Sequence, residues 1–310
     1  MDHHQPVFLQ EAVDALAIDP TGIYIDGTFG RGGHSHEVLA QLGSAGRLIG
    51  FDKDLTAVAA AKARFGADSR FSIIHDSFAN IPQQLAAIGL IGKINGILLD
   101  LGVSSPQLDQ ADRGFSFSHD GPLDMRMDVS QGESIAQLLT HIDEVALANI
   151  LYQYGEEKQS RRIARAIVVA QNQQPIVTTH QLANVIASVM PSREKLGKHP
   201  ATRSFQALRI YINRELEDLQ QCLKTIQPLL LPAGRLAVIS FHSLEDRIVK
   251  QFMQQGVQGK EPLRGLPLRE DEISREQKWR WCIKMEKPSA AELEVNPRSR
   301  SAILRVVEKR

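Results

Sequence analysis

The chain has 310 residues, and its 36 lysines and arginines are balanced by 36 aspartates and glutamates, giving a formal net charge of zero at pH 7. This length suits one large domain or two ordinary ones, and the neutral charge excludes a protein that coats nucleic acid nonspecifically. With two distant cysteines, no signal-peptide pattern and no apolar run near the ~18 residues of a membrane span, we expect a cytoplasmic protein without structural metal or membrane partner.

In the first hundred residues, short apolar runs alternate with helical patterns. After a first helix over 8–16, the patterns predict strands over 23–26, 46–52, 71–78 and 94–100, with helices between them over 34–42, 54–65 and 83–88. Near-continuous apolar strands separated by helices predict a parallel sheet covered on both faces. Three strands end in Asp26, Asp52 and Asp100, which puts three carboxylates at the edge where open α/β sheets bind ligands.

A glycine-dense loop follows the first strand. Backbone in such a strand–turn–helix can approach a nucleotide-like ligand closely. The loop lacks the lysine of a P-loop, and the last position of Gly-x-Gly-x-x-Gly, counted from Gly30, is Ser35. The pattern that fits is acid-x-x-x-Gly-x-Gly, with Asp26, Gly30 and Gly32, as in S-adenosylmethionine-dependent methyltransferases. A tight turn without a ligand is the alternative for this stretch alone.

The rhythm changes from residue 107 to 203, where no strand pattern occurs. Helical periodicity is found over 135–142, 145–152, 163–168 and 182–189. The α/β pattern then resumes with a long helix over 202–227, a strand over 234–240, a helix over 244–254, a polar loop over 256–276, and strands over 278–285 and 301–307.

These patterns predict a Rossmann-like class I methyltransferase fold of α/β type. Residues 1–106 and 204–310 would form a mostly parallel sheet with one antiparallel edge strand, which binds S-adenosylmethionine. Residues 107–203 would form an inserted helical subdomain for substrate recognition.

Side chains at the strand ends suggest roles in chemistry. Asp52 follows Asp26 at the spacing at which nucleotide-binding folds place an acid on the ribose hydroxyls. Asp100 begins Asp-Leu-Gly-Val, where amino-methyltransferases usually carry Asp/Asn-Pro-Pro-aromatic. The acid is therefore evidence for a methyltransferase, but without the Pro-Pro-aromatic it does not identify the acceptor atom. We predict that Asp100 orients the acceptor amine. Asn213 and His242 are further catalytic candidates, and a hydrogen-bonded structural histidine is the alternative for His242.

Several longer segments resemble one bacterial family. They are Asp26-Gly-Thr-Phe-Gly-Arg-Gly-Gly-His-Ser, Leu99-Asp-Leu-Gly-Val-Ser-Ser-Pro-Gln-Leu-Asp, Gly121-Pro-Leu-Asp-Met-Arg-Met-Asp, His199-Pro-Ala-Thr-Arg, Ile239-Ser-Phe-His-Ser-Leu-Glu-Asp and Asn296-Pro-Arg-Ser-Arg-Ser. The family is ribosomal RNA small subunit methyltransferase H, also called the MraW family, and the likeness runs from His4 to nearly the C-terminus. By match to its motifs, cofactor contacts would fall on Gly32, Gly33, His34, Asp52, Phe78, Asp100 and Gln107.

The resemblance implies transfer of a methyl group from S-adenosylmethionine to the exocyclic N4 amine of a cytidine in the decoding (P-site) region of 16S rRNA. The implied partner is 16S rRNA, as naked RNA or within the small ribosomal subunit, and the protein could be a monomer or a homodimer. Open alternatives are methylation of another RNA or DNA amine, a nucleotide-sugar or NAD-dependent enzyme, and a non-catalytic RNA-binding protein that retained the fold.

Basic residues gather around the predicted insertion. For RNA phosphates, we predict contacts from Arg161, Arg162, Arg165, Arg203 and Arg209, with Arg193, Lys195 and Lys198 in the same span. A solvated charged helix face is the alternative.

Overall fold

The structure is a computed structural model that describes residues 6–190, 199–259 and 277–310. It divides into two compact units: unit 1 comprises Met1–Gly102 with Leu216–Arg310, and unit 2 comprises Val103–Glu215. The polar loop was predicted over 256–276. Its first three residues belong to α13 (Ser243–Gln258), and residues 260–276 lie outside the described residues. Arg193, Lys195 and Lys198 are also outside them.

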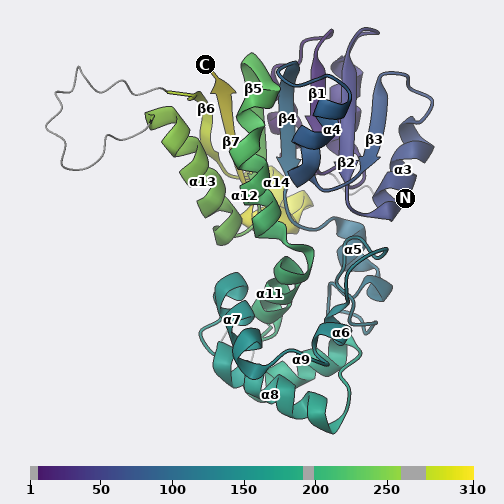
Figure 1. Cartoon of the computed structure of the whole chain (residues 1–310), viewed down its shortest axis with the longest axis vertical. Helices are drawn as coiled ribbons and strands as arrows, with labels where there is room; N and C mark the ends of the chain where they lie inside the picture. Colours follow the sequence, from purple (N-terminus) through teal and green to yellow (C-terminus); the bar gives the residue numbers. More distant parts are fainter. Residues whose placement is uncertain (1–5, 191–198, 260–276) are drawn as a thin grey trace, which may run out of the picture. The chain divides into compact units, whose positions relative to one another are not determined.

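Unit 1 contains a seven-stranded sheet in the order β3-β2-β1-β4-β5-β7-β6 (Figure 1). Its strands are β1 (Ile23–Asp26), β2 (Arg47–Asp52), β3 (Phe71–His75), β4 (Ile94–Asp100), β5 (Leu230–Ser240), β6 (Trp279–Glu286) and β7 (Ile303–Lys309). Strands β1 to β5 pair in parallel, whereas β7 is antiparallel to both β5 and β6. The predicted Rossmann-like, mostly parallel sheet is confirmed, and its antiparallel strand lies next to the edge strand β6.

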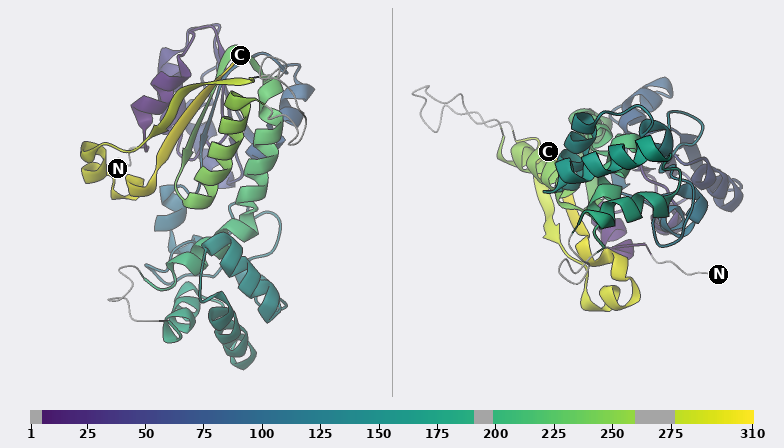
Figure 2. Two further views of the ribbon diagram at one scale, coloured as in Figure 1. Left: turned by 90° about the vertical axis from the view of Figure 1, so that its left-hand side faces the viewer. Right: turned by 90° about the horizontal axis from the view of Figure 1, so that it is seen from below.

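Helices cover both faces of this sheet, because alternate residues of each strand point to opposite faces. On β1, Tyr24 packs in one apolar cluster and Ile25 in the other. The Tyr24 face is covered by α1 (Leu9–Leu16), α2 (Gly33–Gln41) and α3 (Leu55–Phe65). The Ile25 face is covered by α4 (Ile81–Ala87), α12 (Glu215–Ile226) and α13, and Figure 2 shows the two layers on either side of the strands.

Four short elements complete unit 1: η1 (Phe78–Asn80), η3 (Gln227–Leu229), α14 (Ala290–Val295) and η4 (Pro297–Ser301). The sequence patterns did not predict α14, which carries no buried residue, so it leaves no apolar periodicity to read. None of the helices in the described ranges is long and apolar enough to cross a bilayer.

Unit 2 is built from helices around its own apolar core. Its elements are α5 (Ser105–Asp109), η2 (Ala111–Arg113), α6 (Ile135–Leu138), α7 (Glu144–Gly155), α8 (Ser160–Gln173), α9 (Thr179–Ser188) and α11 (Thr202–Asn213). Phe205 and Leu208 of α11 are buried in this core, so α11 belongs to unit 2. Unit 2 therefore spans Val103–Glu215, whereas the sequence predicted an insertion over 107–203.

The predicted single helix over 202–227 is wrong. The chain leaves α11 at Arg214, which has the left-handed φ of 54°, and starts again as α12. The Arg214 amide donates to the carbonyls of Ile210 and Tyr211, which ends α11 in a tight turn. Left-handed backbone usually selects glycine, so the arginine gave no signal of a break.

Candidate active site

The strand register explains why the three acids differ in depth. Asp26 pairs with Gly50 of β2 and Leu98 of β4, so β1 ends two residues before the neighbouring strands reach Asp52 and Asp100. The glycine loop leaves the sheet at this short strand. The order β2-β1-β4 also makes the gap between β1 and β4 the point where strand order reverses, which is where open α/β sheets bind ligands.

Backbone geometry makes the loop dependent on glycine at Gly32. Its φ of 70° is left-handed, and a Cβ there would lie 2.4 Å from the Phe29 ring. Gly32 caps α2, which starts at Gly33, and the Gly30 amide donates to Asp52 Oδ2 at 2.7 Å. The loop is therefore held against the acid at the end of β2.

Asp26, at the end of β1, holds the glycine loop through hydrogen bonds. It is 2% exposed, and its carboxylate accepts bonds from the Ser35 hydroxyl at 2.7 Å and from the Thr28 amide at 3.2 Å. The Thr28 hydroxyl in turn accepts the Asp100 amide at 2.6 Å. Asp26 thus supports the loop from within, while the roles of Thr28 and Ser35 were not predicted from the sequence.

Burial disfavours charge on all three acids. It raises the pKa of Asp26 to about 6 and that of Asp52 to about 6, against partial stabilisation of each carboxylate by hydrogen bonds. The pKa of Asp100 rises well above its usual value, first through burial and then through the negative charges of Asp26 and Glu245. The edge is therefore electrostatically suited to a ligand that carries positive charge.

His34 faces Asp100 as a neutral imidazole. Its Nε2 lies 3.1 Å from the Val7 carbonyl oxygen, which can only accept, so Nε2 carries the proton and Nδ1 presents a lone pair. Nδ1 lies 3.8 Å from Asp100 Oδ2, beyond hydrogen-bond distance, and burial lowers the pKa of His34 to about 4. Asp100 Oδ1 is buried and has no partner among the described residues. An orphaned buried acceptor is costly, so this oxygen marks a place for a donor from a ligand.

Asp52 ends β2, whereas Phe78 lies beyond the neighbouring strand β3, which ends at His75 and not at Phe78 as the sequence pattern predicted. Phe78 is half-buried at the start of η1 and packs partly against the apolar core. Gly27 lets it lie close, because a Cβ at Gly27 would come within 3.2 Å of the Phe78 Cβ. Asp52 is half-buried and accepts the amides of Gly30 and Asp54, one on each oxygen.

His242 caps a helix. Its Nδ1 accepts the Glu245 amide at 3.4 Å, and its Nε2 lies 3.1 Å from Glu245 Oε1. Glu245 is 1% exposed, and its Oε2 accepts hydrogen bonds from the amides of Phe241 and His242. This reciprocal capping box fixes the start of α13 at the end of β5. The catalytic role of His242 stays a prediction, and this geometry favours the structural alternative.

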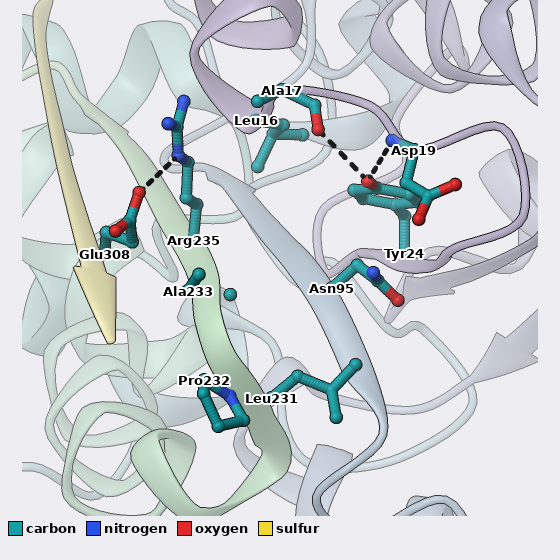
Figure 3. Close-up of a pocket in the computed structure, with 11 residues that line it drawn as sticks. Leu16, Ala17, Asp19, Tyr24, Asn95, Leu231, Pro232, Ala233, Arg235 and Glu308 are labelled. Atoms are coloured by element: carbon teal, nitrogen blue, oxygen red, sulfur yellow. Dashed lines mark hydrogen bonds and ion pairs between the residues drawn. The ribbon is translucent and has the colours of Figure 1, made fainter. Parts of the chain in front are cut away.

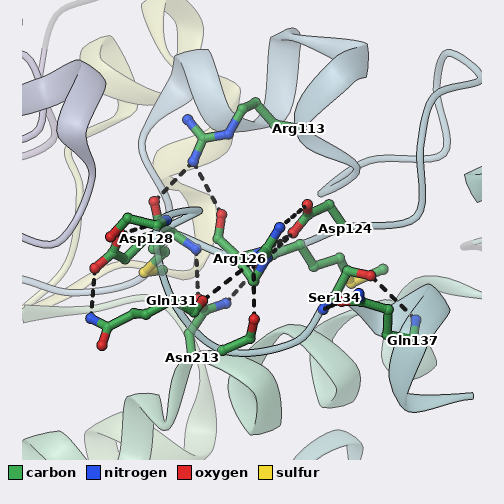
Figure 4. A network of polar contacts seen from close by, with 12 residues as sticks. Arg113, Asp124, Arg126, Asp128, Gln131, Ser134, Gln137 and Asn213 are labelled. Atoms are coloured by element: carbon green, nitrogen blue, oxygen red, sulfur yellow. Dashed lines mark hydrogen bonds and ion pairs between the residues drawn. The ribbon is translucent and has the colours of Figure 1, made fainter.

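Two other predicted site residues belong to unit 2. Gln107 is buried in α5, where its Oε1 accepts the Ser104 amide at 2.9 Å. Asn213 holds a loop: its Oδ1 accepts the Met127 amide at 2.7 Å and its Nδ2 donates to the Met125 carbonyl at 2.7 Å (Figure 4). Met125 has a left-handed φ of 65° and is fully buried, so Asn213 stabilises a strained turn. Its predicted catalytic role would compete with these bonds.

The five predicted RNA-binding arginines also lie in unit 2, and they differ in availability. Arg161, Arg162 and Arg165 are exposed on α8, opposite its buried positions. Arg203 is exposed on α11 and donates to the Glu156 carbonyl at 3.4 Å. Arg209 is half-buried in a two-bond ion pair with Glu215, at 2.8 and 2.9 Å. The α8 arginines are thus the better candidates for phosphates.

Comparison with known proteins identifies the family. A family model described as the MraW methylase family matches residues 1–310. The chain belongs to the MraW methylase family. It is 53% identical to ribosomal RNA small subunit methyltransferase H of Shewanella denitrificans and of Thioalkalivibrio sulfidiphilus, each over 99% of this chain and 97% of the relative. An rRNA methylase structure from Streptococcus thermophilus matches with a TM-score of 0.43 at 12% identity, covering 100% of this chain and 98% of that one.

Membership of the MraW methylase family confirms the expected cofactor, S-adenosylmethionine. The residues of the edge fit this group. The glycine loop allows close backbone approach, the half-buried Asp52 can accept ribose hydroxyls, and the orphaned Asp100 Oδ1 can accept a donor.

A separate cavity of this MraW-family chain lies at the opposite edge of the sheet. Its volume is about 270 Å³, and it is lined by residues near the starts of β1, β4 and β5, including Tyr24, Asn95 and Arg235 (Figure 3). The Tyr24 hydroxyl is bonded to the Asp19 amide, and Arg235 pairs with Glu308. The cavity therefore lies at the other ends of β1 and β4 from Asp26 and Asp100.

Proposed function

We propose that this protein methylates the N4 amine of a cytidine in the decoding region of 16S rRNA. The observation that carries the proposal is full-length similarity to relatives named ribosomal RNA small subunit methyltransferase H, at 53% identity over 99% of the chain. The choice of cytidine N4 rests on the motif resemblance, centred on the acid Asp100. The compartment would be the cytoplasm, where ribosomal subunits are assembled.

The side chains divide the work as follows. Asp52 accepts the ribose hydroxyls, Phe78 lies on the adenine, and the loop at Gly32 and Gly33 holds the amino-acid end. His34 stays neutral beside Asp100 and adds no competing positive charge, since burial lowers its pKa to about 4. The family motifs also predict a cofactor contact for Gln107. These groups bind the cofactor in one orientation.

S-adenosylmethionine, when bound, supplies an electrophilic methyl group on a sulfonium. It would give this methyl group to the amine nitrogen as the carbon–sulfur bond breaks with its electrons to sulfur, and the proton lost from the nitrogen would pass to water. Asp100 accepts an N–H of the amine and aligns its lone pair with the methyl carbon. Alignment carries most of the rate enhancement, because in-line transfer depends on the geometry of approach.

The exposed α8 arginines would bind phosphates. We expect Arg161→Glu with Arg162→Glu to weaken binding of the decoding-region RNA about tenfold or more at low salt, because two phosphate contacts become repulsive. Affinity for S-adenosylhomocysteine, measured by calorimetry, should stay within about twofold of wild type. The matched control is Arg47→Glu with Lys93→Glu, two exposed cations near the starts of β2 and β4 that give the same change of net charge. Equal RNA affinity for the two double variants would remove the α8 arginines from the RNA interface.

The buried acids predict a pH dependence that separates the donor from its product. Asp26 and Asp52 have pKa values of about 6, so a sulfonium cation favours their ionised forms and its binding releases protons. We therefore expect affinity for S-adenosylmethionine to rise from pH 5.5 to 7.5 about fivefold more than affinity for neutral-sulfur S-adenosylhomocysteine. Both ligands share the same titrating amino-acid end, so taking the ratio of their dissociation constants cancels it. A ratio independent of pH would show that these acids do not respond to the sulfonium.

The decisive experiment maps methylated nucleosides by mass spectrometry in rRNA from cells with and without the protein. We expect the loss of one N4-methylated cytidine in the decoding region. Loss of a different methylated nucleoside would support the alternative acceptor, and an unchanged map would support a non-catalytic RNA-binding protein. Methylation of naked rRNA and of purified small subunits in vitro then identifies the physiological substrate.

A further inference from the structure

A buried aspartate outside the predicted site connects two of its loops. Asp218, 9% exposed in the first turn of α12, receives two bonds on one oxygen. Lys53 Nζ lies 2.6 Å from Asp218 Oδ2, and the Ser77 hydroxyl donates to the same oxygen at 2.6 Å. An ion pair and a charge-assisted hydrogen bond thus meet at one atom, which is a stronger arrangement than either alone.

The two partners of Asp218 are chain neighbours of the proposed adenosine contacts. Lys53 directly follows Asp52, which ends β2, and Ser77 directly precedes Phe78, which starts η1. A displacement of either partner is therefore passed to the adjacent site residue through the backbone. Two further contacts join the same segments, since His75 Nε2 lies 2.9 Å from the Lys53 carbonyl oxygen and the Asp76 amide donates to the Asp52 carbonyl at 3.1 Å. Asp218 adds a link from α12 that reaches both segments through one carboxylate oxygen.

The η1 segment depends on this anchor. The Ser77 hydroxyl accepts the Ala79 amide at 3.1 Å and so caps η1 while donating to Asp218. One turn further along α12, Gln221 Nε2 donates to the Ala79 carbonyl at 3.4 Å. Residues 218 and 221 lie on the same side of α12. Cys222 of that side is 1% exposed in the core, so the helix that carries Asp218 is firmly packed.

We propose that Asp218 is a positioning residue for the adenosine half of the methyl donor, because it fixes the spacing between the ribose acid Asp52 and the adenine aromatic Phe78. This inference rests on the proposed function. Asp218 acts through Lys53 and Ser77 and does not itself touch the ligand. When its charge is removed, the ion pair between Asp218 and Lys53 is lost, and the hydrogen bond from the Ser77 hydroxyl that holds the cap of η1 is weakened.

The test measures binding of S-adenosylhomocysteine to the full chain by calorimetry. We expect Asp218→Asn to raise the dissociation constant about tenfold, and the KM for the donor in rRNA methylation to rise equally while kcat changes less than about twofold. The matched control is Glu308→Gln. Glu308 pairs with Arg235 at side-chain exposures of 11% and 26%, close to the 12% and 22% of Asp218 and Lys53, but it lies at the opposite edge of the sheet.

The control separates positioning from general stability. Both variants should lower the thermal midpoint of the ligand-free chain, but only Asp218→Asn should weaken ligand binding. Equal ligand affinities for the two variants would overturn the inference. If wild type itself binds no S-adenosylhomocysteine, the proposed function fails and this inference fails with it. If wild type binds the ligand and Asp218→Asn binds it equally well, only the inference about Asp218 fails.

A second pair of variants applies even if Asp218→Asn does not fold. Ser77→Ala removes the hydroxyl that links Asp218 to η1, whereas Ser77→Thr retains a hydroxyl that can both cap η1 and reach Asp218. We expect weaker ligand binding for Ser77→Ala and recovery of most of the affinity for Ser77→Thr. Wild-type affinity for Ser77→Ala would contradict the positioning role.

Discussion

Replacing Asp52 with alanine is expected to raise the dissociation constant for S-adenosylhomocysteine about a hundredfold. Hydrogen bonds to a charged group contribute about 1.5–3 kcal/mol, and the variant loses the acceptor proposed for two ribose hydroxyls. It also leaves the amides of Gly30 and Asp54 without their acceptor, which loosens the glycine loop. The measurement is calorimetry with S-adenosylhomocysteine, together with the affinity for decoding-region RNA, which should change less than about twofold.

Asp52→Asn is the control that separates the contribution of the charge from the contribution of the hydrogen bonds to the glycine loop. The amide oxygen can still accept one backbone N–H and preserve part of the loop, but the charge is lost. An intermediate affinity for Asp52→Asn would assign the remainder to the ribose acid itself. Equal losses of ligand and RNA affinity in Asp52→Ala would instead indicate general unfolding and would contradict the assigned role.

The positions of the three acids could be predicted because they depend on local pattern. Apolar runs that stop at Asp26, Asp52 and Asp100 mark strand ends, and parallel strands bring their carboxyl ends to one edge. Their relative depth could not be predicted in this way. It depends on pairing register, and the register that leaves Asp26 two residues short of its neighbours appears only when β1, β2 and β4 are aligned.

The supporting residues were missed because their partners are distant in the sequence. Thr28 meets Asp100 across 72 positions, and Ser77 meets Asp218 across 141. A serine or threonine after a strand is common in turns, so its residue type carries no signal of such a contact. The break at Arg214 was missed for a similar reason, since apolar periodicity continues on both sides of it.

Residue type indicates which groups a side chain can bind, but it does not show whether the protein itself already occupies that side chain. The sequence predicts Asn213 as a catalytic candidate and Arg209 as a contact to RNA phosphates. In the structure the Asn213 amide holds the Met125–Met127 turn, and the Arg209 guanidinium pairs with Glu215. Polar groups that are buried or half-buried are usually satisfied within the protein, so exposure separates Arg161 and Arg162 from Arg209 as ligand contacts.

Asp100→Asn is expected to lower kcat for rRNA methylation by about 10²–10³, comparable to removing one group that stabilises charge developing in a transition state. The amide keeps the shape of the side chain but loses the negative charge that orients the amine. In wild type, burial with the charges of Asp26 and Glu245 raises the pKa of Asp100, so part of its population is protonated where an ordinary aspartate is ionised. Only the ionised form accepts the amine on either oxygen, and wild-type kcat should therefore fall as pH is lowered through this raised pKa.

Single-turnover methyl transfer from labelled donor, measured across pH, checks both parts of this expectation. The limb of the profile that rises with pH should be present in wild type and absent from the residual activity of Asp100→Asn. Asp246→Asn is the matched control, because it removes a carboxylate of α13 that pairs with Arg305. It should retain both kcat and the rising limb. Retention of the limb by Asp100→Asn would assign the titration to another group, because the asparagine amide cannot ionise in this range.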